Sequence, residues 1–297
     1  MATLREIRRR INAIKSTQKI TKAMKMVSAA RLRRAQDAIL KFRPYASEID
    51  NLFLELFDKI PNYAHPLFFK RQVKKILLLV LTSDRGLCGS FNSNIFRAIE
   101  DFINKKLKTK YENVKVSLIC VGKKGFDYFN KRNYRIDQKY LNFYADLSID
   151  NVRNLIEIIK EKFLTGEVDK VYAVYNEFIS VISQKVKIEE LLPIKIVRKV
   201  IDKKNVRAIY EFIYEPDKEK ILNSLVPKFF EVKTYRMFLE SYASEQGARM
   251  TAMDNATENA KELLRILSLS YNRARQAAIT KELLEIVAGA SALKEIK

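Results

Sequence analysis

The sequence predicts an α/β protein in which a long helix at each end of the chain flanks a central domain of alternating strands and helices. All six prolines and five of the seven glycines lie between Pro44 and Pro227, so both ends are nearly free of residues that interrupt helices. Between residues 70 and 215, apolar runs alternate with amphipathic segments. That alternation is typical of a sheet covered by helices on both faces.

The first predicted region, residues 1–43, is a single helix without glycine or proline. Its seam has a heptad-like repeat that is apolar at both ends and polar in the middle. The seam consists of Leu4, Ile7, Ile11, Ile14, Gln18, Thr21, Lys25, Ser28, Leu32, Ala35, Ile39 and Phe42. In the middle we expect the apolar stripe to move sideways onto Ile20, Met24 and Val27, because a straight helix drifts against a strict seven-residue repeat.

The last predicted region, residues 228–297, is a longer helix whose seam is rich in alanine, which lets a neighbouring helix approach closely. That seam consists of Leu239, Tyr242, Gln246, Arg249, Met253, Ala256, Ala260, Leu263, Leu267, Ser270, Ala274, Ala277, Lys281 and Leu284. We expect the two terminal helices to form a long antiparallel two-helix coiled coil that projects from the central domain. The apolar tip beyond Tyr271 then has no partner within the chain and implies a protein that encloses it.

The central region, residues 44–227, is predicted to be a Rossmann-like α/β domain. Helices are expected at 92–107 and 151–164. Strands are expected at 75–82, 114–121, 168–175, 179–188 and 206–214.

A glycine-bearing loop, residues 83–90, follows the first predicted strand, where a doubly wound fold would hold a ligand. It lacks both the phosphate-loop and the dinucleotide-binding glycine patterns. We therefore favour a tight turn, with Ser90 or Asn92 capping the next helix, over nucleotide binding.

No catalytic, cofactor or metal site is predicted. His65 is the only histidine and is expected on the surface, and Cys88 and Cys120 are far apart in sequence and are expected to be buried, reduced thiols. A histidine-based triad or a multi-histidine metal site cannot be built from one histidine. The longest apolar run, residues 76–81, is too short to cross a bilayer, and the basic N-terminus lacks the apolar stretch of a secretory signal.

Positive charge is concentrated in the first helix. The chain carries a net charge of +21, and residues 1–43 contain thirteen Lys or Arg against only Glu6 and Asp37. Such a helix fits an acidic protein surface or the phosphates of a nucleic acid. Phe42 is the only aromatic residue in this region, which weakens the case for stacking against single-stranded bases.

Three stretches of the sequence closely resemble the gamma-subunit family of F-type rotary ATP synthases. They are residues 1–32 near the N-terminus, with Thr17-Gln-Lys-Ile-Thr-Lys-Ala-Met-Lys-Met-Val at their centre, the central Thr82-Ser-Asp-Arg-Gly-Leu-Cys-Gly-Ser-Phe-Asn92, and the C-terminal residues 244–290. They occur in the family's order and span the full chain.

This resemblance implies a non-catalytic rotor shaft without a cofactor. Its tip would be held by a ring of alpha and beta subunits, and its α/β domain would sit on the membrane c-ring beside the epsilon subunit. The residues carried over as contacts with beta subunits are Met24, Lys25, Arg275, Gln276, Thr280 and Glu282. The expected location is the cytoplasmic face of a bacterial inner membrane, as a peripheral subunit.

Two alternatives from other classes remain open at the level of sequence. A basic coiled-coil protein could bind nucleic acid through the first helix, with an affinity that falls steeply with salt. A nucleotide-dependent enzyme could use the turn between Gly86 and Gly89. Neither alternative gives a role to the apolar tip.

Overall fold

A computed structural model of the chain describes residues 3–60, 63–111, 113–181, 183–195 and 214–295. The chain divides into two compact units. We call residues 1–28 and 250–297 the two-helix unit, and residues 29–249 the body. Among the described residues, none of the helices combines the length and apolarity needed to cross a membrane.

The terminal helices are longer than the sequence predicts. Helix α1 spans Leu4–Lys59 and contains Pro44, and helix α6 spans Lys218–Glu295 and contains Pro227. Each proline deprives the carbonyl four residues earlier of its donor. Those carbonyls belong to Leu40 and Asn223, which are both exposed, so water can replace the missing bond. The prolines are therefore tolerated inside the helices instead of ending or starting them.

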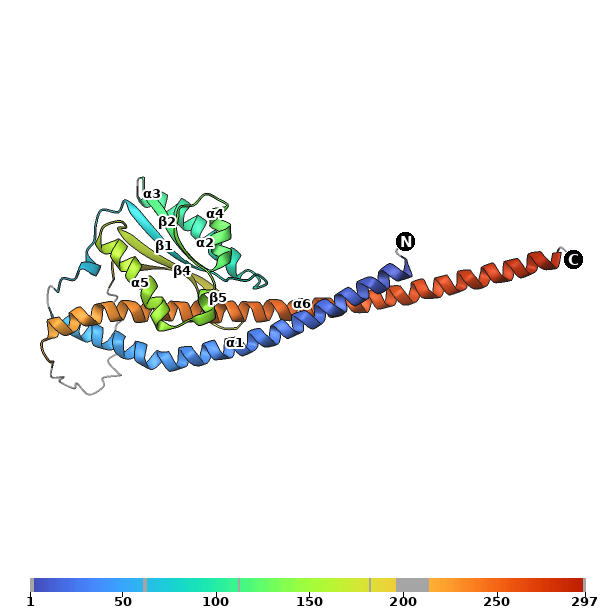
Figure 1. Cartoon of the computed structure of the whole chain (residues 1–297), viewed down its shortest axis with the longest axis horizontal. Coiled ribbons are helices and arrows are strands. Elements are labelled where there is room, and N and C mark those ends of the chain that lie inside the picture. The colour runs from blue at the N-terminus through green and yellow to red at the C-terminus, as the bar shows by residue number, and fades with distance from the viewer. Residues whose placement is uncertain (1–2, 61–62, 112, 182, 196–213, 296–297) are drawn as a thin grey trace. The chain divides into compact units, whose positions relative to one another are not determined.

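The body contains one five-stranded sheet in the order β3-β2-β1-β4-β5 (Figure 1). Its strands are β1 Lys75–Leu81, β2 Lys115–Val121, β3 Ile136–Tyr140, β4 Lys170–Phe178 and β5 Gln184–Leu192. The first four are parallel and β5 runs antiparallel to β4 along one edge. This topology confirms the predicted α/β domain.

Strand β3 and helix α4, Lys123–Asn130, were not predicted. The sequence of β3, IDQKY, is a short, half-buried edge strand without an apolar run, so periodicity does not reveal it. The predicted strand at 206–214 lies outside the described residues except at its last position.

Helices cover both faces of the sheet. One face packs against α2 Phe91–Asp101, its π-helical continuation Phe102–Leu107 with the short α3 Lys108–Lys110, and α4. The other face packs against α5 Ile149–Leu164 and the body segments of α1 and α6. The side chains of β1 alternate between these two cores, with Ile76, Leu78 and Val80 on the α2 face and Leu77, Leu79 and Leu81 on the α5 face. Two short 3-10 turns, Pro66–Phe68 and Phe143–Asp146, precede β1 and α5.

Inside the body, α1 and α6 run antiparallel and meet through aromatic side chains. The rings of Phe53 and Phe229 stack with centroids 4.2 Å apart, and Phe42 meets Tyr235 edge-on at 4.9 Å. Phe238 of α6 continues this packing toward α5 by contacting Phe143 at 5.2 Å. These pairs fix the register of the two helices.

In the two-helix unit, α1 and α6 are also antiparallel, as predicted. Thr21 shares a hydrogen bond with Thr257, and Lys25 pairs with Asp254. The expected sideways movement of the apolar stripe is wrong, because Ile20 and Val27 are more than half exposed.

The polar seam residues of α1 keep their places at the helix interface because α6 presents matching polar side chains. On α6 two predicted seam positions shift by one residue, because Leu264 and Tyr271 are partly covered whereas Leu263 and Ser270 are exposed. The seam positions Leu267 and Ala274 are partly covered, as predicted.

Candidate partner-contact surfaces and the filled crevice of the sheet

The first predicted contact region, around Met24 and Lys25, lies on the half-covered side of α1. The Lys25 ammonium is engaged by the Asp254 carboxylate across the helix pair. Next to them, Ile20, Met26 and Val27 are exposed apolar side chains. This surface therefore combines an intramolecular ion pair with apolar groups that solvent reaches.

The second predicted contact region is the exposed end of α6. Every side chain from 275 to 289 is exposed, and these include Arg275, Gln276, Thr280 and Glu282. Four large apolar residues of the same stretch recur at spacings of four, three and one, so they form a stripe along the helix. They are Ile279, Leu283, Ile286 and Val287, between 48% and 63% exposed.

An exposed apolar stripe on a helix marks an interaction surface. The four predicted contact residues lie along the same stretch as this stripe, which we call the tip stripe. Their contact with another subunit stays a prediction, because the structure contains this chain alone.

The glycine-bearing loop between β1 and α2 is held by the side chain of Asn92, which was predicted to cap α2. The Asn92 amide oxygen accepts the Ser83 N–H at 3.1 Å, and its NH2 group donates to the Ser83 hydroxyl at 2.7 Å. Ser90 precedes α2 but makes no side-chain cap, because its φ and ψ of −84° and 4° lie outside the extended region of a helix cap. The predicted capping by Ser90 or Asn92 is therefore wrong.

In a doubly wound sheet, ligands bind outside the carboxyl ends of the strands, where the strand order reverses. Here that point lies between β1 and β4, and α6 fills it. The Ser244 hydroxyl donates to the Asn176 carbonyl of β4 at 3.0 Å, and the Arg249 guanidinium donates to the Arg85 carbonyl of the loop at 3.0 Å. A Cβ at Gly247 would lie 3.3 Å from the Val181 carbonyl oxygen, so the helix backbone approaches the sheet closely. The crevice that would hold a nucleotide is occupied by the chain itself.

A buried ion pair stands at the centre of this contact. The Arg249 guanidinium bonds the Glu245 carboxylate one turn earlier on α6, and both side chains are about nine-tenths buried. Burial raises the pKa of Glu245, and the neighbouring Arg249 charge opposes that rise. Arg249, paired with Glu245, therefore holds α6 against the loop between β1 and α2 through its bond to the Arg85 carbonyl, and we call this pair the α6 latch.

The remaining reactive side chains have structural roles. His65 is half-buried, and its Nδ1 accepts the Leu67 N–H at the start of a 3-10 turn, which corrects the expected surface position. Burial lowers the pKa of His65. Burial also raises the pKa of the Cys88 thiol, and raises that of Cys120 to about 12, so neither is a ready nucleophile at neutral pH. No group of three or more possible metal ligands occurs within the described part of the chain.

The α6 latch was not predicted from the sequence. Its signal was present in the polar seam positions Gln246 and Arg249 beside Gly247. Polar residues at seam positions next to a glycine indicate a close approach to a polar surface, which here is the edge of the sheet.

Comparisons with known proteins match nearly the whole chain to ATP synthase proteins. The family model described as ATP synthase matches residues 3–293. An ATP synthase gamma chain of Chloroherpeton thalassium is 48% identical over 99% of both chains, and one of Chlorobium phaeobacteroides is 50% identical over the same shares. Among solved structures, the rotor of Euglena gracilis mitochondrial ATP synthase has the same fold, with a TM-score of 0.63, 21% identity, and coverage of 93% of this chain and 98% of that one. A central stalk and c-ring structure from Tetrahymena thermophila has a TM-score of 0.59 and 25% identity, covering 80% of this chain and 99% of that one.

Proposed function

Because the chain belongs to the ATP synthase gamma chain family, we propose that it is the central rotor shaft of such an enzyme. It would transmit rotation of the proton-driven c-ring to conformational changes at the catalytic sites of the beta subunits, where ATP is made or hydrolysed. The chain itself would catalyse no reaction. It would work at the periphery of the bacterial inner membrane, on the cytoplasmic side, with alpha, beta and epsilon subunits and the c-ring as partners.

The observation that carries this proposal is the exposed end of α6 with its tip stripe. An isolated protein gains nothing from keeping large apolar side chains about half exposed or more on a helix, whereas a protein sleeve around the helix would cover them. We propose that alpha and beta subunits form that sleeve. Met24 and Lys25 would contact beta subunits from α1, and Arg275, Gln276, Thr280 and Glu282 would contact them from α6.

The energy that a rotor transmits limits what these contacts do. If roughly three charges cross ~150 mV per step, at ~2.3 kcal/mol per charge per 100 mV, about 10 kcal/mol passes along the shaft. A partly exposed ion pair supplies about 0 to 1 kcal/mol. We therefore propose that the stiffness and asymmetric shape of the helix pair carry the coupling, and that charges guide the orientation.

The structure gives less support to the two alternatives left open by the sequence, a nucleotide-dependent enzyme and a nucleic-acid-binding protein. In the crevice of the α/β domain, α6 contacts both the end of β4 and the loop that contains Gly86 and Gly89, so the chain itself occupies the place where a nucleotide would bind. The basic face of α1 would meet an acidic protein surface. Binding of nucleic acid by this face has no support beyond its charge.

Co-expression with alpha and beta subunits tests the proposal. We expect the full chain to join a stoichiometric complex, and we expect ATP hydrolysis to lose its coupling to rotation when the chain ends at Tyr271. A finer variant replaces Ile279, Leu283, Ile286 and Val287 with serine, and its control replaces Arg273, Lys281, Glu285 and Asn272 with serine. The apolar variant should lose coupling more strongly than the control.

A chain that stays alone in co-expression would contradict the proposal. So would equal effects of the apolar variant and its control on coupling. If the lone chain instead binds DNA with an affinity that falls steeply with salt, the nucleic-acid alternative is favoured.

A further inference from the structure

The surface at the amino ends of the parallel strands and the surface at their carboxyl ends differ sharply in charge. Three connections lead into the amino ends of β1, β2 and β3, and their residues 70–75, 105–115 and 131–135 contain twelve Lys or Arg and one acidic residue. The connections that leave the carboxyl ends of the same strands, residues 82–90, 122–124 and 141–148, contain three basic and two acidic residues. We call the first surface the basic edge.

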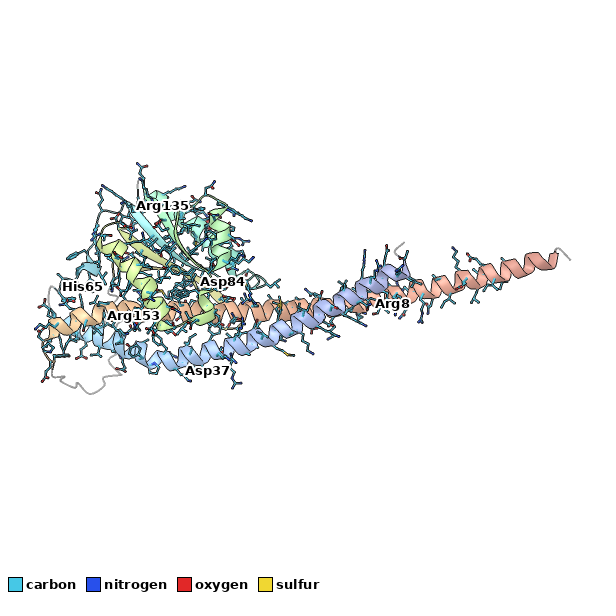
Figure 2. All side chains as sticks on the ribbon, viewed as in Figure 1. Arg8, Asp37, His65, Asp84, Arg135 and Arg153 are labelled. Carbon is cyan, nitrogen blue, oxygen red and sulfur yellow. The ribbon has the colours of Figure 1, made fainter. Side chains whose placement is uncertain are left out.

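Topology brings these three connections together. Strands β1, β2 and β3 are parallel neighbours in the order β3-β2-β1, so their amino ends lie side by side. Figure 2 shows Arg135 at this end of the α/β domain and Asp84, from the loop after β1, at the other end. The connection into β4 carries Glu167 and Asp169, which restricts the positive charge to the side of β1, β2 and β3.

The packing at the basic edge leaves like charges close together. Lys75 and Lys115 begin β1 and β2 and are direct partners in the parallel register, and both are exposed. Like charges on neighbouring strands destabilise a sheet. Asp169 accepts the backbone N–H groups of Lys74 and Lys75 at 2.8 Å each and so is engaged by the main chain. An external anionic surface would relieve this repulsion.

The composition of the basic edge separates a lipid partner from a protein partner. Nine of its twelve basic residues are lysine. Protein interfaces are enriched in arginine and depleted in lysine, whereas lysine clusters bind anionic membranes as flexible point charges. All three arginines have partners within the body, since Arg71 donates to the Phe163 carbonyl, Arg132 covers the Tyr128 ring and Arg135 pairs with Asp137. Phe69, beside Lys70, is half exposed, and aromatic rings are favoured at membrane interfaces.

The basic edge lies at a defined end of the body. The last turns of α1 pack on the 3-10 turn before β1, where the rings of Phe57 and Phe68 are 5.8 Å apart. Tyr63 bonds Asn223 at the beginning of α6. The α6 latch holds the opposite edge of the sheet, at Arg85. The basic edge is therefore on the side of the body where α1 ends and α6 begins.

From this arrangement, we propose that the basic edge is an electrostatic contact with the anionic lipid headgroups of the membrane. The inference rests on the proposed function, in which the α/β domain sits at the membrane beside the c-ring. Each lysine near an anionic surface adds a small, screened attraction, and the contact does not depend on one geometry. It would hold the body at the membrane while still allowing it to turn.

Vesicle flotation tests this inference on the full chain assembled with alpha and beta subunits. The probe is a vesicle of phosphatidylglycerol and phosphatidylcholine, compared with a vesicle of phosphatidylcholine alone. One variant carries Lys106→Gln, Lys108→Gln, Lys110→Gln and Lys115→Gln. Its matched control removes the same charge elsewhere on the body, through Lys41→Gln, Lys123→Gln, Lys124→Gln and Lys185→Gln.

We expect the basic-edge variant to lower partitioning to the anionic vesicles at least about tenfold, and the control to change it less than about threefold. Arginine at the same four positions should restore partitioning, which excludes misfolding as the cause. Equal losses in the variant and the control would overturn the inference, because net charge alone would explain them. Absence of wild-type partitioning to the anionic vesicles would also overturn it.

Assembly separates this inference from the proposed function. Both variants should join the complex and hydrolyse ATP like the wild type, because the basic edge is remote from the tip stripe in sequence. If the wild-type chain fails to assemble, the proposed function is contradicted, and flotation is repeated on the full chain alone. There the comparison variant is Arg8→Gln, Lys15→Gln, Lys19→Gln and Lys22→Gln on α1. The inference fails if this variant reduces partitioning more than the basic-edge variant does.

Discussion

Helix α6 passes through two very different environments. From Met237 to Arg249 nearly every side chain is buried, whereas from Arg275 to Gly289 every one is exposed. In the body, α6 has the α/β domain on one side and α1 on another. Its polar residues are therefore buried and need hydrogen-bond partners. At the exposed end, no face of the helix is covered by a described residue.

This contrast shows that helix propensity and periodicity do not decide whether a helical residue stabilises the chain or contacts a partner. A leucine or phenylalanine in the body segment contributes to the stability of this chain. The same residue type in the exposed segment is available for a partner. Substitutions in the body segment of α6 should therefore change stability, whereas substitutions in its exposed segment should change function.

The largest effect on stability is expected for Phe238→Ala in the body segment. Phe238 is fully buried and contacts Phe143, so removing its ring leaves a cavity between α6 and the sheet domain. We expect the free energy of unfolding to fall by about 3 to 5 kcal/mol, measured by urea denaturation of the full chain. The control on the same helix is Leu269→Ala, at a half-exposed position, which should change stability by less than about 0.5 kcal/mol. Similar losses at both positions would remove the contrast.

The next effect is expected at the α6 latch. Arg249→Met leaves the Glu245 carboxylate buried without its partner, and we expect a loss of about 3 kcal/mol at neutral pH. Adding Glu245→Gln should recover part of that loss, because the uncompensated charge is removed. Recovery would be absent if Arg249 acted only through its bond to the Arg85 carbonyl.

The latch also predicts a dependence on pH. In the Arg249→Met chain, burial keeps the folded-state pKa of Glu245 above its ordinary value of 4.5, without the opposing charge. The unfolded chain then loses its proton first as pH rises, so stability should fall above pH 4.5 until the folded carboxyl also ionises. Denaturation curves from pH 4 to 8 measure this slope. If the Arg249→Met chain is as stable at pH 8 as at pH 4, the buried Glu245 carboxylate is not the cause of the loss.

A smaller loss of stability, with the opposite dependence on pH, is expected for a substitution of Glu231 in the body segment of α6. Burial tends to raise the pKa of Glu231, but bonds from Arg153 and Lys228 outweigh it and hold the pKa below 4.5. Such a carboxylate stabilises the fold above its unfolded pKa and loses that contribution as pH falls through the folded value. Glu231→Gln should cost about 1 to 2 kcal/mol at neutral pH, and the difference from wild type should shrink below pH 4.5.

The sequence predicted elements whose pattern is repeated or continuous, and it missed those that depend on tertiary contacts. The run Ile76 to Leu81 identified β1, because a strand buried on both faces is apolar without interruption. The helix ends predicted at Pro44 and Pro227 were wrong, because each proline lies inside its helix and the residue four positions earlier is exposed, which no local pattern shows. Strand β3 was missed because it is a short edge strand.

The same limit applies to the candidate sites. Exposure of the tip stripe followed from the unequal lengths of the two terminal helices, which can be counted in the sequence. The α6 latch did not follow, because Arg249 and the Arg85 carbonyl are 164 residues apart and meet only when α6 fills the crevice. The polar seam around Thr21 was predicted in position, but its partner Thr257 became known only from the register of the helix pair.

The smallest effect is expected at Lys25 in the two-helix unit. Its ion pair with Asp254 is about half exposed, so Lys25→Ala should lower stability by less than about 1 kcal/mol. If the stiffness of the helix pair carries coupling, this variant should also keep ATP hydrolysis coupled in the assembled complex, as should Arg275→Ala. A double variant, Lys25→Ala with Asp254→Ala, serves as the control for an unpaired carboxylate. Loss of coupling in a single variant that still folds and assembles would mean that charge, and not stiffness, transmits the rotation.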